Sequence, residues 1–227
     1  LQRDFQRLSE FSSDLAHELR TPISNLLTQT QVTLAQPREV AVYQETLASN
    51  AEEFQRLGRM VSDMLLLAKT EHGLALPHRE PVALHQAAQA LFDFFDVVAE
   101  EKGVTLVLEG QATTQGDRLM LQRAISNLLS NAIRHAPGDS QVRVSVNSTD
   151  GAPSLCVDNA GPAIASEHLP RLFDRFYRVD KSRAHISAES TGLGLAITHA
   201  IMQAHGGTVS VASTSEHTRF CLRFLAT

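Results

Sequence analysis

One histidine in this chain stands in a setting that suits nucleophilic chemistry. His17 is followed directly by Glu18, and Thr21 and Pro22 come four and five residues after it. A neighbouring carboxylate can hold one ring nitrogen and make the other more basic. In a helix, Thr21 shares the face of His17, where its hydroxyl can position a water molecule or a phosphoryl oxygen. For a lone His-Glu pair, an ordinary surface histidine beside a solvated glutamate is the simpler interpretation.

The residues around His17 predict a helix with the imidazole on its solvent side. Leucines recur there at spacings of three, four or seven, the pattern of a buried seam: Leu8, Leu15, Leu19 and Leu26. His17 is two residues from both Leu15 and Leu19, about 200° around the helix from either. Pro22 removes a backbone donor and is expected to bend the helix.

The first part of the chain predicts a helical hairpin. One helix runs from Leu1 to about Ala35, and another from about Glu39 to Thr70. The second helix has a regular seam of Tyr43, Leu47, Asn50, Phe54, Leu57, Val61, Met64 and Ala68. Such a hairpin cannot bury both apolar faces, so we expect it to pair with a second copy in an antiparallel four-helix bundle. A monomeric hairpin packed against the second domain is the alternative. Asn50 is expected to fix the register.

The rest of the chain predicts a mixed α/β domain. We expect strands at 81–84, 104–108, 142–146, 154–157, 209–211 and 219–224, with helices at 87–102, 118–135 and 193–205. This pattern favours an α/β sandwich with helices on one face of the sheet. The expected domains are 1–72 and 73–227, joined by a linker that begins near Gly73. The long segment 162–190 is interpreted as a lid.

Two stretches of this second domain carry groups that suit nucleotide binding. Asn127 and Asn131 lie four apart on one helix face, where amide oxygens can complete a Mg²⁺ shell, and Arg134 and His135 follow one turn later. The segment 191–195 is a Thr-Gly-Leu-Gly-Leu turn that opens a helix, where backbone amides and the helix dipole favour phosphate. Solvated asparagines and an ordinary tight turn would explain each stretch alone.

Taken in order, the motifs resemble those of sensor histidine kinases. HELRTP (17–22) resembles the H-box. NLLSNA (127–132), VDNAGPAI (157–164), FDRFYR (173–178) and TGLGL (191–195) resemble the N, G1, F and G2 boxes. The sequences of residues 11–31 and 168–183 are similar to those of the heavy-metal-sensing branch of this family. The resemblance covers nearly the whole chain and implies a Bergerat-type ATP-binding sandwich after a dimeric four-helix bundle.

The resemblance also implies roles for individual residues. His17 accepts the γ-phosphoryl group of ATP, Glu18 is the general base, and Thr21 assists dephosphorylation. Asn131 ligates Mg²⁺. The other nucleotide-binding residues are Asn127, Arg134, His135, Asn159, Gly161, Ile164, Arg178, Arg183, Gly192, Leu193, Gly194 and Leu195. The implied partners are a second copy of the chain and the receiver domain of a response regulator.

The G1 box departs from its family pattern, D-x-G-x-G. Asn159 stands where the family has the aspartate that reads the adenine amino group, and Ala163 replaces the second glycine. Asparagine still offers an acceptor oxygen, but a charge-assisted bond is about twice as strong as a neutral one. Modest nucleotide affinity is therefore expected. Asp158 can replace Asn159 only if the strand register shifts.

Composition narrows the functional classes. The net charge of −5 with mixed signs favours neither a nucleic-acid surface nor a polybasic membrane surface. Cys156 and Cys221 lie in apolar alternating segments without C-x-x-C spacing, so buried free thiols in a reducing compartment are expected rather than a disulfide. The chain opens inside a helical pattern without an N-cap. The expected context is the cytoplasmic portion of an inner-membrane sensor.

Three functions are compatible with the sequence. The first is an ATP:protein-histidine phosphotransferase acting as a homodimer. The second is a dimeric nucleotide-responsive scaffold that acts mainly as a response-regulator phosphatase, with weak kinase activity because of Asn159 and Ala163. The third is an ATPase of the chaperone or topoisomerase kind, which explains the later motifs but not residues 17–22.

Overall fold

The computed structural model describes residues 2–71, 78–179 and 192–226, with side chains of the first helix given from Ser13 onward except Asp14. The chain separates into two compact units, residues 1–62 and 63–227. None of the helices in the described ranges combines the length and the hydropathy needed to traverse a lipid bilayer.

The expected helical hairpin comprises the first unit and residues 63–71 of the second. Helix α1 spans Gln2–Leu34 and helix α2 spans Val40–Glu71. Helix α1 continues through Pro22, whose side chain is buried. The two helices are tied by polar contacts: Asn50 Nδ2 donates to Thr30 Oγ1 at 3.1 Å, and the hydroxyls of Thr33 and Thr46 lie 3.2 Å apart. Asn50 is therefore a buried register contact within the hairpin itself.

Several large apolar side chains of the hairpin remain uncovered. Leu27, Leu47 and Phe54 are 57%, 67% and 62% exposed, whereas Leu26 on the inner seam is buried. Apolar side chains recurring on a second face of a long helix usually meet another helix. A single hairpin therefore buries only part of its apolar surface.

From Glu80 onward, the second unit is the expected α/β sandwich. Its elements in chain order are β1 (Glu80–Ala83), α3 (Leu84–Glu101), β2 (Val104–Gly110), β3 (Thr113–Gly116), α4 (Arg118–His135), β4 (Ser140–Thr149), β5 (Ala152–Ala160), η1 (Leu169–Arg171), α5 (Gly194–Ala204), β6 (Thr208–Ser213) and β7 (His217–Arg223). Two of these, β3 and the short 3-10 helix η1, were not expected from the sequence. Strand β3 pairs antiparallel with β1, and its Thr-Thr-Gln-Gly composition carries no apolar alternation.

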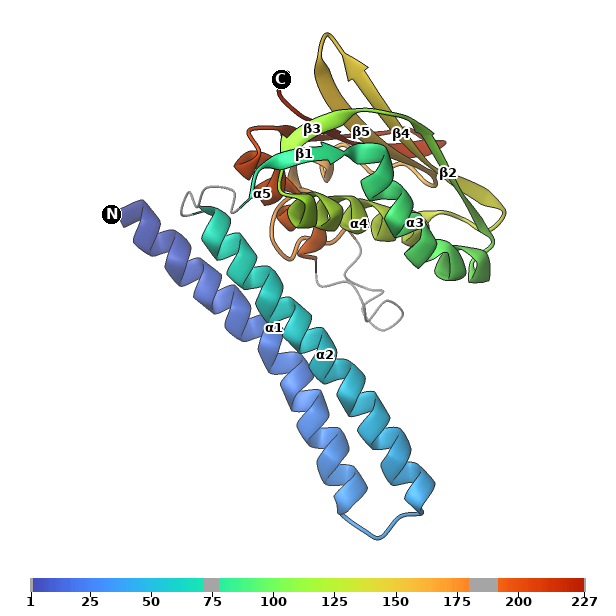
Figure 1. Cartoon of the computed structure of the whole chain (residues 1–227). Helices are drawn as coiled ribbons and strands as arrows, with labels where there is room; N and C mark the ends of the chain where they lie inside the picture. The colour runs from blue at the N-terminus through green and yellow to red at the C-terminus, as the bar shows by residue number, and fades with distance from the viewer. Residues whose placement is uncertain (1, 72–77, 180–191, 227) are drawn as a thin grey trace. The chain divides into compact units, whose positions relative to one another are not determined.

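The five-stranded sheet has the order β2-β4-β5-β7-β6, in which β2 and β4 are parallel and the other neighbours antiparallel. Helices α3, α4 and α5 gather on one side of this sheet (Figure 1). Side chains on that side form the core, including Val144, Leu155, Val157, Phe220 and Leu222. The opposite side carries polar groups such as Arg143, Asp158 and Arg219.

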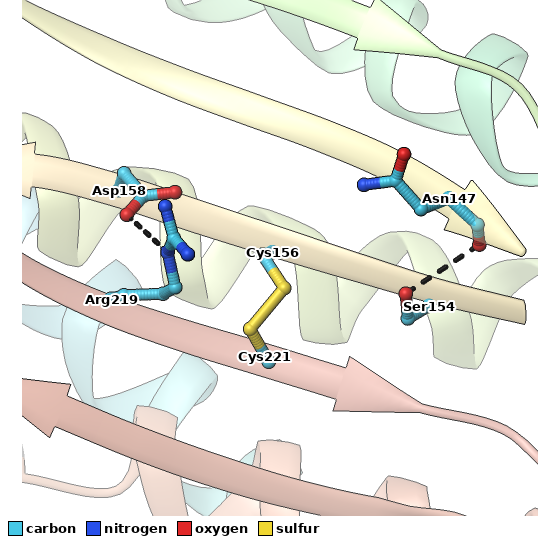
Figure 2. Close-up of a disulfide and its surroundings, with 6 residues drawn as sticks. All are labelled: Asn147, Ser154, Cys156, Asp158, Arg219 and Cys221. Atoms are coloured by element: carbon cyan, nitrogen blue, oxygen red, sulfur yellow. Dashed lines mark hydrogen bonds and ion pairs between the residues drawn. A yellow bond between two sulfur atoms is a disulfide. The ribbon is translucent and has the colours of Figure 1, made fainter. Parts of the chain in front are cut away.

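The cysteine prediction was wrong, because Cys156 and Cys221 form a disulfide (Figure 2). They are directly opposite each other in the antiparallel pair of β5 and β7, with Cα atoms 4.1 Å apart. Their sulfurs therefore meet on the polar side of the sheet, next to the ion pair of Asp158 with Arg219. The two cysteines are 65 residues apart in the chain, so only the strand register brings them together.

Candidate functional site

The asparagines of α4 lie next to the first turn of α5. Asp117 caps α4 by accepting a hydrogen bond from Met120 N at 3.0 Å, and the apolar face of the helix is buried. On the flank of that face, Asn127 Nδ2 donates to Gly194 O at 2.9 Å. This bond orients the amide of Asn127 and brings the N and G2 boxes together. Asn131 follows one turn later and is half-buried.

The glycine turn before α5 is built for close backbone approach. Gly192 has a φ of +70°, and a Cβ added there would come 2.8 Å from Phe176 Cα. Phe176 N donates to Gly192 O at 3.0 Å, and Phe176 itself has a φ of +58°. Only glycine fits such a crossing of two chain segments. The F and G2 boxes are therefore in direct contact.

The N-terminus of α5 presents backbone donors. Its N-cap residue, Leu193, makes no side-chain capping bond in the described part of the chain, and its side chain is fully buried. The first amides of a helix have no partner within the helix, and the dipole there favours negative charge. Leu193 can thus contribute to anion binding through its backbone alone, as can Gly194 and the half-buried Leu195.

Strand β5 ends in a buried polar cluster. Asn159 is 4% exposed and donates through Nδ2 to Ala160 O at 2.8 Å. Thr218 on β7 is directly opposite and 5% exposed, and its hydroxyl lies 2.8 Å from Ser213 Oγ. Ser213 in turn accepts a hydrogen bond from Ile164 N at 2.9 Å. Asn159 therefore faces the helices, whereas Asp158 lies on the opposite side of the sheet.

Thr218 and Ser213 were not identified in the sequence. The sequence gives little indication of their role, because a threonine at the start of one strand and a serine at the end of another are common in hairpins. Only the pairing of β7 with β5 places Thr218 beside Asn159.

The C-terminal end of α4 meets the loop after β5. A Cβ built on Gly161 would lie 3.3 Å from His135 O. Lys102 Nζ donates to Ile133 O at 2.7 Å and to Arg134 O, placing a cation at the negative end of the helix dipole. Desolvation, followed by the charges of Arg134 and Lys102, lowers the pKa of His135 below its ordinary value. A neutral imidazole is thus favoured beside these two cations.

The aromatic-basic segment is anchored at both ends. Phe173 makes an edge-to-face contact with Phe220 of β7, with ring centroids 6.4 Å apart. Tyr177 OH lies 2.6 Å from His168 Nδ1, and the Arg171 guanidinium sits 4.3 Å from the centroid of the Tyr177 ring. Arg178 is half-buried. The predicted Arg183 and residues 180–190 of the predicted lid lie outside the described residues.

The histidine of the hairpin is exposed as expected. His17, Glu18 and Thr21 are exposed, while Leu15 and Leu19 are partly covered. All five lie within α1, and the helical spacing puts His17 and Thr21 on one face. The imidazole is therefore accessible to a reaction partner. The catalytic roles of these three residues remain predictions, and the linker near Gly73 lies outside the described residues.

Two family profiles match the chain. Residues 7–73 match the His Kinase A (phospho-acceptor) domain, and residues 116–227 match the histidine kinase-, DNA gyrase B-, and HSP90-like ATPase family. Among curated relatives, the sensor histidine kinase CusS of Escherichia coli O157:H7 is 47% identical over 219 residues, which are 96% of this chain and 45% of that protein. The sensor protein CzcS of Cupriavidus metallidurans is 40% identical over 99% of this chain and 47% of its own length. The chain therefore spans about half the length of these relatives.

Solved structures show the same fold. The histidine kinase AdeS of Acinetobacter baumannii superposes with a TM-score of 0.77 at 23% identity, covering 93% of this chain and 98% of that one. The histidine kinase ThkA, solved in complex with the response regulator protein TrrA, gives a TM-score of 0.77 at 18% identity, covering all of this chain and 64% of that one. Together with the family matches and the curated relatives, they confirm the resemblance drawn from the motifs: the chain belongs to the sensor histidine kinases, with a phospho-acceptor helical hairpin followed by the ATPase sandwich of that family.

Proposed function

We propose that this chain transfers the γ-phosphoryl group of ATP to His17 and then to an aspartate of a response-regulator receiver domain. The hydrogen bond from Asn127 to Gly194 O carries this proposal, because it brings an amide-bearing helix face next to the first turn of α5, where the N-cap residue Leu193 makes no side-chain capping bond within the described residues. Oxygen ligands for a divalent cation and donors for phosphate thus lie within one small region.

In this proposal the phosphates bind at the start of α5. The backbone amides of Gly192, Leu193, Gly194 and Leu195 cradle the phosphate oxygens, since the Leu193 side chain is buried and unavailable. Asn131 ligates Mg²⁺, with Asn127 and Arg134 beside the phosphates. Carboxamide oxygens suit this hard cation. When bound, Mg²⁺ neutralises negative charge on the phosphates.

The adenine end of the site is assigned to the buried cluster at the end of β5. Asn159 accepts a hydrogen bond from the adenine amino group, supported by the neighbouring Thr218. Gly161 allows the loop to pass close to His135 O, and Ile164 is held through its backbone by Ser213. His135, Arg178 and Arg183 are assigned to the phosphate end.

At the hairpin, one imidazole nitrogen of His17 attacks the γ-phosphorus while Glu18 accepts the proton of the other nitrogen. The bond between the γ-phosphorus and the bridging oxygen breaks, and ADP leaves. Thr21 then positions water for dephosphorylation of the regulator.

The working unit is a homodimer, in which a second copy covers the exposed apolar face containing Leu47 and Phe54. The chain acts as the cytoplasmic part of an inner-membrane sensor, with no nucleic-acid partner and no membrane contact of its own.

Incubation with γ-labelled ATP and Mg²⁺ tests this function. An acid-labile, alkali-stable label is expected on the wild-type chain and on His78→Gln, an exposed histidine before β1 that serves as the control. The label is expected to disappear in His17→Gln. A label that survives in His17→Gln, or phosphate release without any labelled protein, would contradict the proposal.

A second function is favoured by one observation, the presence of Asn159 and Ala163 in the G1 box. Loss of the charged acceptor weakens adenine binding. Under this alternative the chain mainly dephosphorylates its partner regulator. Nucleotide binding without labelling of His17, together with accelerated loss of phosphate from a phosphorylated receiver domain, would favour this alternative.

A further inference from the structure

A buried histidine lies at the C-terminal end of α5, at the opposite end from the glycine turn. His205 is 6% exposed, and its Nε2 lies 3.0 Å from the backbone N of Asp117. A backbone N–H can only donate, so Nε2 must be the unprotonated acceptor. Nδ1 then carries the hydrogen and donates to Ile201 O at 2.7 Å. Both ring nitrogens are satisfied by backbone groups, and the tautomer is fixed.

The surroundings are shaped to hold the ring. A Cβ added to Gly116 would come 2.5 Å from Cδ2 and 2.7 Å from Nε2 of His205, so only glycine leaves room for this contact. The neighbouring Asp117 is the N-cap of α4, and its side chain accepts from Met120 N. The imidazole therefore binds the backbone at the residue where α4 begins.

In the described part of the chain, hydrogen bonds join α4 and α5 at two places. The start of α4 meets the end of α5 at Asp117 and His205, while the middle of α4 meets the start of α5 at Asn127 and Gly194. The helices are therefore antiparallel. At 1.5 Å per residue, Asp117 and Asn127 are about 15 Å apart along α4, and Gly194 and His205 are about 16 Å apart along α5. Because these spacings nearly match, contacts at both places fix the axial position of α5 against α4.

Burial has the largest effect on the pKa of His205 and lowers it below the ordinary 6.5. The positive charge of Arg79 lowers it further. The Ile201 hydrogen bond and the charge of Asp117 act in the opposite direction. A predominantly neutral ring at neutral pH agrees with the acceptor role that the geometry assigns to Nε2.

We propose that His205 is a positioning residue for the phosphate half of the nucleotide site. It touches neither phosphate nor Mg²⁺. Through Asp117 it holds α4 in the register that keeps Asn127 and Asn131 beside the first turn of α5. This role rests on the proposed function, since it assumes that phosphates bind at that turn. The adenine half is built on β5 and β7 and meets α4 at its far, C-terminal end, so it should depend less on this hydrogen bond.

The role predicts a selective loss of affinity. In His205→Leu the buried N–H of Asp117 loses its acceptor, and α4 loses its hydrogen bond to the C-terminal end of α5. We expect affinity for Mg²⁺ with a non-hydrolysable ATP analogue to fall about tenfold, while affinity for adenosine changes less than about twofold. In His205→Gln the amide oxygen can reach the former Nε2 position, and we expect affinity to return to within about threefold of wild type.

The experiment is ligand titration of the whole chain, with unfolding measured in parallel. Met202→Ala is the matched control, because it removes a fully buried side chain of the same helix without removing a hydrogen bond. It should lower stability and leave the ratio of the two affinities unchanged. Equal loss of both ligands in His205→Leu, or the same selective loss in Met202→Ala, would overturn the positioning role. Failure of wild type to bind the Mg²⁺–analogue complex would overturn the proposed function itself.

Two further measurements do not require His205→Leu to fold. Long-range 1H–15N spectra of wild type should show an unprotonated Nε2 and a protonated Nδ1 for His205, and the reverse tautomer would overturn the proposal. Gly116→Ala keeps the imidazole but pushes it away from Asp117. It should reproduce the selective loss of phosphate-dependent affinity, and unchanged affinity would count against the role.

Discussion

The hairpin and the sandwich bury apolar surface in different ways. In the hairpin, Leu47 and Phe54 are more than 60% exposed, whereas in the sandwich Leu128, Leu155 and Leu222 are completely buried. The sandwich closes its core with helices from its own chain, on one side of its sheet. Among the described residues, the hairpin has no such covering layer. Its stability should therefore depend on protein concentration, and that of the sandwich should not.

The hairpin and the sandwich also differ in how their reactive groups are positioned. The hairpin offers an exposed imidazole on a helix, a position specified by local spacing. The sandwich assembles its site from segments far apart in the chain, such as Asn127 with Gly194 and Asn159 with Thr218. An accessible nucleophile is suited to meeting several partners, whereas a nucleotide site needs fixed geometry. Changes in the hairpin should alter assembly, and changes in the sandwich should alter nucleotide binding.

The largest effect is expected from placing charge on the uncovered face of the hairpin. Burial of one Leu or Phe side chain contributes about 1.5–3 kcal/mol, and a buried unpaired carboxylate adds a further cost of several kcal/mol. Leu47→Glu combined with Phe54→Glu should convert a dimer into a monomer at micromolar concentration, as measured by analytical ultracentrifugation. Phe94→Glu is the control, because Phe94 on α3 is 74% exposed. A double variant that remains dimeric would show that another surface joins the two copies.

A smaller effect is expected from the disulfide, which lies within the sandwich. The Cys156–Cys221 bridge closes a long loop across β5 and β7. Reduction should lower the free energy of unfolding of the sandwich by about 2–4 kcal/mol, because a cross-link restricts the unfolded chain. Urea unfolding with and without a phosphine reductant measures this change.

The double variant Cys156→Ser with Cys221→Ser controls for the reductant, since its stability should not respond to it. The dimer mass should stay the same in all these samples. Two reactive thiols in the unreduced, denatured wild type would contradict the bridge and restore the expectation of free cysteines.

The parts predicted correctly from the sequence are those set by local patterns. The leucine spacing around His17 predicted an exposed imidazole, and the helix expected at 118–135 has the bounds of α4. The errors involve strand pairing. Strand β3 has no apolar alternation, and the disulfide depends on a register between strands 65 residues apart. Thr218 and His205 were missed for the same reason, because their partners are distant in the chain. Thr218 lies opposite Asn159, and His205 binds the backbone of Asp117.

The smallest expected effect tests the adenine end of the site. Asn159→Asp restores a charged acceptor, and a charge-assisted hydrogen bond is about twice as strong as a neutral one. Affinity for adenine nucleotides should rise about threefold to tenfold, measured by titration with a non-hydrolysable analogue. The free domain should become less stable by about 1–2 kcal/mol, because the bond from Asn159 Nδ2 to Ala160 O is lost and a carboxylate is buried.

Asp158→Asn is the matched control on the adjacent residue. Its side chain lies on the other side of the sheet and pairs with Arg219, so nucleotide affinity should not change. A rise in nucleotide affinity together with a loss of stability in Asn159→Asp would show that a negative charge at this position is favourable only when the nucleotide is bound. If Asn159→Asp lost stability without gaining affinity, the adenine would not be read at the end of β5. The sandwich would then resemble the hairpin, with its reactive groups specified locally at the start of α5.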